Sequence, residues 1–205
     1  MPPKPKITKD MILSAVLELT QETGFETVNA RSIAKKLQCS TRPIFTCYEN
    51  MEKLKTEFLD YAFEFYHQYV ADYGKSVNTI PYLLLPLSYL EFAKNETNLF
   101  KLLFISDMDL DMTEANDFYK EIGNEKKAAA FSEMIGVSLE RGKEIFLDLF
   151  LYTHGMAVLT ATGKLSFDRC NSEKMLLNFL SAYIHPEIER TGTENENKPV
   201  FNRIL

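Results

Sequence analysis

Residues 24–54 decide the fold, and their sequence is GFETVNARSIAKKLQCSTRPIFTCYENMEKL. Asn29, Ser40 and Asn50 are residue types that cap helix N-termini, and apolar residues at helical spacing follow each of them. The stretch predicts two short helices joined only by Gln38-Cys39, and then the start of a longer helix. Two short helices with so brief a joint predict a helix-turn-helix, whose second helix enters the major groove of DNA.

The flanking sequence adds one helix before this motif and lengthens the one after it. Thr8 is placed to cap the earlier helix, and Gly24 is placed to end it. After Asn50, apolar residues continue at steps of three and four as far as Tyr69. We therefore expect a three-helix head in residues 1–50 and a long fourth helix that leads away from it.

The second helix of the motif is expected to present a short cationic and aromatic surface. Ile44 and Tyr48 lie one turn apart and are expected to face inward. The residues left on or near the outer surface are Thr41, Arg42, Phe45 and Thr46. An arginine can bond guanine O6 and N7, a threonine can bond base edges or phosphates, and a phenylalanine can pack on a thymine methyl.

Helical spacing also dominates the remainder of the chain. The expected helices cover 81–93 with a kink at Pro86, 95–105, 124–135, 139–162 and 172–184, and a loop with some helix is expected over 106–121. We predict an all-α protein of about nine helices. Residues 51–190 form its larger domain, and residues 191–205 form a polar tail.

Composition and charge narrow the class of protein. The 205 residues are 45% apolar and 25% charged, which excludes a disordered or fibrous chain. Residues 1–56 hold nine Lys/Arg and six Asp/Glu, while the remaining residues hold 14 and 23, so the net charges are +3 and −9. A basic head on an acidic body is expected to approach phosphate with the head alone.

The sequence contains no pattern typical of a signal peptide, a membrane-spanning helix or a metal-binding cysteine cluster. It has no apolar leader core and no charge-free stretch of about 18 apolar residues. The three cysteines form no C-x-x-C pair, and we expect them to be reduced thiols. We therefore expect a cytoplasmic protein that does not associate with membranes.

Residues 8–56 resemble the DNA-binding head of the tetracycline-repressor (TetR) family, whose pattern starts at a Gly-aromatic pair, here Gly24-Phe25. The family consists of dimeric, mostly repressing regulators. The resemblance implies DNA contacts from Arg31, Thr41, Arg42, Phe45 and Cys47, with Lys53 and Lys55 near the phosphates. In this chain Phe45 stands where the family usually has Tyr, Arg42 where it often has Gly, and Met51 where it often has Lys.

The body carries a second signal, which points to a dimer. Residues 145–159 are apolar on nearly every side of the expected helix, so that helix must be buried on two sides. With the last helix it predicts an isologous four-helix interface, which two heads would use to read a palindromic operator. The interface residues are expected to be Tyr152, Met156, Leu159, Leu176, Phe179, Leu180 and Tyr183.

The resemblance further implies an inducer pocket in residues 51–190. The residues it places there are Tyr66, Tyr89, Phe92, Phe100, Phe104, Met108, Met134, Phe150 and His154. Their apolar and aromatic side chains suit a small apolar or aromatic ligand, although core packing accounts for such residues equally well. We expect a repressor that this ligand releases from DNA.

Nothing in the sequence points to catalysis, a cofactor or a metal. The Glu64-x-x-His67 pair lacks the second such pair that a di-iron bundle needs. Asp107, Asp109 and Asp111 imitate the start of a calcium loop that lacks its glycine and its final glutamate. Two alternatives stay open, namely a regulator controlled by a protein or peptide, and a helical small-molecule enzyme with a vestigial DNA-binding head.

Overall fold

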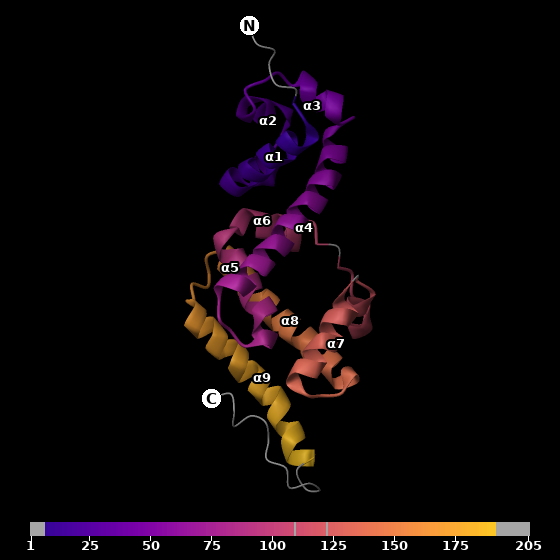
Figure 1. The fold of residues 1–205 in the computed structure, drawn as a ribbon, viewed down its shortest axis with the longest axis vertical. Coiled ribbons are helices and arrows are strands. Elements are labelled where there is room, and N and C mark those ends of the chain that lie inside the picture. Colours follow the sequence, from indigo (N-terminus) through magenta and orange to yellow (C-terminus); the bar gives the residue numbers. More distant parts are fainter. Residues whose placement is uncertain (1–6, 109, 122, 192–205) are drawn as a thin grey trace. The chain divides into compact units, whose positions relative to one another are not determined.

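Every regular element in the described part of the chain is a helix. The computed structural model describes residues 7–108, 110–121 and 123–191, with side chains described as far as residue 184. Within these ranges it contains nine α-helices, three 3-10 helices and one π-helix, and no strand (Figure 1). The prediction of an all-α fold is confirmed.

The first four α-helices and one short turn occupy the N-terminal part of the chain. They are α1 (Lys9–Thr23), the 3-10 turn η1 (Phe25–Thr27), α2 (Ala30–Lys36), α3 (Arg42–Cys47) and α4 (Met51–Ser76). Thr8 accepts a hydrogen bond from the amide of Met11 at 3.3 Å, and Asn50 accepts one from the amide of Lys53 at 2.9 Å. These two predicted caps are therefore confirmed.

The caps of the two short helices differ from each other. Asn29 accepts hydrogen bonds from two amides of α2, and Ser32 closes a capping box by accepting from the Asn29 amide. The cap predicted at Ser40 is wrong by one residue, because α3 starts at Arg42 and Thr41 precedes it without a side-chain cap. Pro43 lies in the first turn of α3, where an amide has no intrahelical partner to lose.

The remaining helices are more often interrupted than the sequence predicts. They are the 3-10 turn η2 (Pro81–Leu83), α5 (Leu84–Asn95), α6 (Thr97–Lys101), the π-helix η3 (Leu102–Ser106), the 3-10 helix η4 (Ala115–Lys120), α7 (Asn124–Ile135), α8 (Leu139–Ala161) and α9 (Arg169–Thr191). Pro86 lies in the first turn of α5, where its missing amide breaks no intrahelical hydrogen bond. The kink predicted at Pro86 is therefore wrong, because a helix begins there instead. Asp109 and the tail beyond Thr191 lie outside the described residues.

The chain divides into two compact units. Among the described residues, unit 1 contains 7–79, 88–108, 110 and 155–166, and unit 2 contains 80–87, 111–121, 123–154 and 167–191. The expected head lies within unit 1, whose fully buried side chains include Ile12, Ile33, Ile44, Leu54 and Phe58. In unit 2, Phe118, Phe131 and Ile145 are similarly buried.

Helix α8 is long and apolar. By length and composition, α8 is apolar enough to cross a membrane, and 39% of its most apolar 18-residue window is buried inside the protein. The core helix of a soluble protein passes the same test of length and composition.

Candidate nucleic-acid interface

The turn between α2 and α3 has a defined hydrogen-bonding pattern. Cys39 donates its amide to the carbonyl of Ala34 at 2.9 Å, and Gln38 donates its amide to that of Lys35 at 3.2 Å. Gln38 has a φ of 51°, the left-handed value that this kind of helix ending requires. The two bonds satisfy carbonyls at the end of α2 and set the direction in which α3 leaves the turn.

A buried face fixes α3 against the rest of the head. Ile44 is fully buried and Tyr48 is 4% exposed, as their spacing predicts. The Tyr48 hydroxyl donates to Glu57 at 3.1 Å, and the Lys9 ammonium lies 2.5 Å from the second carboxylate oxygen of Glu57. Burial, followed by the Glu57 charge, raises the pKa of Tyr48, so its hydroxyl remains a donor. This network ties the end of α3 to α1 and α4.

The opposite face of α3 carries the residues expected to read bases. Arg42 and Phe45 are exposed, and 51% of the Phe45 surface is open to solvent. The isolated chain therefore buries only about half of this aromatic surface. On the same short helix, Phe45 and Arg42 thus offer an apolar and a cationic group to a partner.

The other predicted contacts on α3 are placed less favourably. Thr41 is half-buried, and the Thr46 hydroxyl donates to the Arg42 carbonyl at 2.9 Å within the helix. The Cys47 thiol is half-buried and lies 4.0 Å from the carbonyl of Ile7. The Cys47 side chain therefore contacts the segment that precedes α1.

Cations from α2 and α4 flank this surface. Arg31 is exposed in the first turn of α2, and Lys53 is exposed in the first turn of α4. Lys35, which sequence reasoning did not single out, is exposed in the last turn of α2. Lys55 is instead half-buried and forms an ion pair with Asp107 at 2.6 Å, so its ammonium already has a partner.

Five of the residues assigned to an inducer pocket meet in one aromatic cluster of unit 1. The Tyr66 ring centroid lies 4.9 Å from that of Phe92 and 5.0 Å from that of Phe104. The Tyr89 centroid lies 5.2 Å from that of Phe100 and 5.0 Å from that of Phe104. Edge-to-face arrangements predominate, as in well-packed cores. The rings contact one another, so they serve as core in this structure.

Two phenols are the polar groups of this aromatic cluster. Burial raises the pKa of Tyr66, and burial together with the neighbouring Tyr66 raises the pKa of Tyr89. Both side chains therefore stay neutral at physiological pH and can donate or accept a hydrogen bond. A ligand that opened the cluster would meet two hydroxyl groups among apolar rings.

The remaining residues assigned to the pocket lie elsewhere. Phe150 and His154 stack in unit 2 with ring centroids 5.7 Å apart, and burial lowers the pKa of His154. Met134 is 50% exposed on α7, so it lies at the surface of the chain in this structure. Met134 lies three residues after Phe131, at the edge of the buried face that Ala128, Phe131 and Ser132 form. Met108 is half-buried in the segment that follows η3.

Three residues assigned to the dimer interface are instead core residues of the chain itself. Leu176 is fully buried, Leu180 is 2% exposed and Met156 is 5% exposed. On α9 the pair Leu176 and Leu180 is spaced by four residues and forms the inner stripe with Ile184, which is 5% exposed. The assignment failed because helical spacing identifies an apolar stripe and not what covers it.

A different set of apolar residues remains available on α8 and α9. Leu151 is 51% exposed and Leu159 is 47% exposed, and with Gly155 they follow one stripe of α8 at four-residue steps. Phe179 stacks on Tyr152 with centroids 4.7 Å apart and lies 4.8 Å from the Tyr183 ring. These three aromatic side chains are half-buried. Leu151 was missed because the sequence makes α8 apolar on nearly every side.

Among the described residues, no three His, Cys, Asp or Glu side chains are grouped so that they could hold a metal ion.

No protein-family model matches the chain, and the search of curated protein sequences gave no match either.

Proposed function

We propose that this protein is a sequence-specific DNA-binding transcription regulator of the TetR type. The observation that carries the proposal is the exposed pair Arg42 and Phe45 on a short helix whose other face is locked by Ile44 and Tyr48. A rigid helix that presents a cation and an aromatic ring suits direct readout in the major groove. Arg31 and Lys53 would add contacts to phosphate.

The proposal includes a homodimer that reads a palindromic operator in the cytoplasm. Leu151 and Leu159 are the exposed apolar residues on α8 that a second copy would cover. Gly155 lies between them and has no side chain to keep a neighbouring helix away. Two copies related by a twofold axis would then present two α3 helices to successive half-sites.

Control by a small apolar or aromatic ligand is the third part of the proposal. Phe100 and Phe104 belong to the aromatic cluster and lie on the segment 96–107. This segment also contacts the head, because Gln21 donates to Glu96 at 2.9 Å and Asn98 donates to the Gln21 carbonyl at 3.0 Å. A ligand that moved the rings would therefore disturb contacts of α1. A coupling of about 1–3 kcal/mol is enough to change DNA affinity roughly 5- to 150-fold.

Selection from a random duplex pool tests the proposal without a known target. The purified full chain should enrich a palindrome, and its affinity for that palindrome should exceed that for scrambled DNA by about 1,000-fold or more. If no sequence is enriched and binding at low salt stays weak, the head is not a DNA reader. In that case a helical enzyme becomes the leading interpretation, and turnover of small molecules should be assayed.

A second experiment determines whether a small molecule or a protein controls the binding of DNA. Small aromatic compounds are added to the complex with the selected palindrome, and release of DNA is followed by fluorescence anisotropy. Release by such a compound supports the ligand-controlled regulator. Release by a protein or peptide fraction alone would contradict a small ligand and support the alternative regulator.

A further inference from the structure

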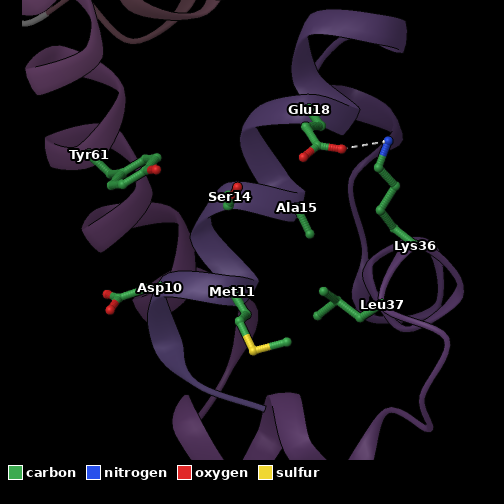
Figure 2. A pocket seen from close by; sticks show the side chains of 8 residues that line it. All are labelled: Asp10, Met11, Ser14, Ala15, Glu18, Lys36, Leu37 and Tyr61. Atoms are coloured by element: carbon green, nitrogen blue, oxygen red, sulfur yellow. Dashed lines mark ion pairs between the residues drawn. The ribbon is translucent and has the colours of Figure 1, made fainter. Parts of the chain in front are cut away.

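The head carries an open groove above α1, between α2 and α4. Its volume is about 480 Å³, within the range typical of small-molecule sites (Figure 2). Along α1 it is lined by Asp10, Met11, Ser14, Ala15 and Glu18, and its walls are Lys36 and Leu37 on one side and Tyr61 on the other. All eight residues belong to unit 1.

The groove has two ends of different chemistry. Asp10 and the ring of Tyr61 lie on the side of α4, while Met11 and Leu37 lie toward α2 (Figure 2). Ala15 is 3% exposed and forms an apolar floor, and Met11 is 37% exposed, which is high for a methionine. One end is therefore anionic and aromatic, and the other combines the apolar Met11 and Leu37 with the Lys36 side chain.

The charges around the groove favour a cation. Glu18 and Glu22 share the single ammonium of Lys36, at 2.9 and 2.8 Å. Among the described residues Asp10 has no ion-pair partner, and its neighbour Lys9 is held by Glu57 at 2.5 Å. This groove is consequently acidic although the head as a whole is basic.

We propose that this groove is a binding site for a small organic cation with an apolar body. The cationic group would lie between the Asp10 carboxylate and the face of Tyr61, and the apolar body would extend over Ala15 toward Met11 and Leu37. Aromatic faces attract quaternary ammonium groups, and a carboxylate nearby adds to that attraction. The residues that line the groove belong neither to the proposed DNA-reading face of α3 nor to the aromatic cluster of unit 1.

The test uses the full chain without DNA and hexyltrimethylammonium as the probe. The chain is labelled with ¹³C at its methionine methyl groups, and the Met11 signal is assigned with the variant Met11→Leu. Titration should shift the Met11 signal to saturation, and added NaCl should weaken the binding, because the charges are exposed. Neutral hexan-1-ol should bind more weakly than the cation.

Variants identify the two groups that recognise the cation. Asp10→Asn and Tyr61→Leu are each expected to weaken binding about two- to fivefold, whereas Tyr61→Phe should keep it. Asp111→Asn is the matched control, because it removes the same charge outside the groove lining and should leave binding unchanged. Circular dichroism confirms that each variant is folded.

Three results would overturn the proposal. These are the absence of a Met11 shift at high millimolar probe, equal affinity for hexan-1-ol and the cation, and unchanged binding by the folded variant Asp10→Asn. The first two use the wild-type chain alone, so they decide the matter even if a variant fails to fold. Because DNA is absent, the outcome leaves the proposed regulator function to its own test.

Discussion

The ammonium of Lys55 lies 2.6 Å from the carboxylate of Asp107, with both side chains mostly shielded from solvent. Lys55 belongs to α4, one turn after its start, and Asp107 directly follows η3. The Lys55 ammonium also lies 5.7 Å from the centroid of the Phe25 ring, which stacks on Phe58. The ion pair therefore joins the base of the proposed DNA-binding head to the segment that carries Phe100 and Phe104.

The first prediction concerns this ion pair. In Asp107→Asn the Lys55 ammonium loses its carboxylate and becomes available to a phosphate. Affinity should then rise alike for the selected palindrome and for scrambled DNA, and the plot of log affinity against log salt should steepen by about one unit. Fluorescence anisotropy over a salt series measures both quantities.

Two controls accompany Asp107→Asn. Adding Lys55→Met to it should abolish the gain, and Asp111→Asn removes a comparable charge without freeing Lys55. A gain that survives in the double variant would show that Lys55 is not the group that reaches phosphate.

The second prediction concerns the chain reversal after α1. Gly24 has φ 87° and ψ 151°, a combination that is nearly confined to glycine. Gly24→Ala should therefore lower the free energy of unfolding by about 1–3 kcal/mol in urea titrations. A Cβ at this position would also clash with the Glu26 carboxylate. The double variant with Glu26→Ala removes that contact and should keep most of the loss, and full recovery would contradict a backbone cause.

How far the sequence predicts the fold depends on which signals are local. The caps at Thr8, Asn29 and Asn50 were predictable, because each depends on a side chain and an amide two or three residues away. The π-helix at 102–106 was not predictable, since helical spacing does not distinguish it from an α-helix.

The site residues divide in the same way. Ile44 and Tyr48 were correctly placed inward because the periodicity of one helix decides it. The partner of Lys55 is 52 residues away, and no local sequence pattern predicts it. Helical spacing also does not show whether an apolar residue is covered by the chain itself, as Leu176 is, or left exposed, as Met134 is.

The third prediction concerns the proposed dimer. Leu151→Glu and Leu159→Glu each place a carboxylate on the exposed stripe of α8 and should shift the protein toward monomer in sedimentation experiments. Burying an unpaired charge at an interface is strongly unfavourable. Met134→Glu is the matched control, because Met134 is equally exposed on α7 and outside the stripe. A monomeric wild type, or dimers that survive both stripe substitutions, would contradict this interface.

The fourth prediction concerns pH. Burial lowers the pKa of His154 in the folded chain below its ordinary value of 6.5, so the unfolded chain takes up the proton first. The stabilisation is therefore complete above pH 6.5 and is lost as the pH falls toward the lowered pKa. His154→Gln should reduce the loss of urea midpoint between pH 7.5 and 5.5. A loss of midpoint as large in His154→Gln as in the wild type would argue against burial of His154 as the cause.

The most direct test of the account is the effect of Arg42→Ala on DNA recognition. The affinities of the wild type and the variant are measured for the selected palindrome, for each of its single-base substitutions and for scrambled DNA at one salt concentration. Arg42→Ala should cost about 1–3 kcal/mol on the palindrome and should abolish discrimination at one base pair in each half-site, while Lys53→Ala weakens all sequences alike. If Arg42→Ala also weakens binding to every sequence equally, or if the wild type shows no preference for the palindrome, α3 does not read DNA sequence.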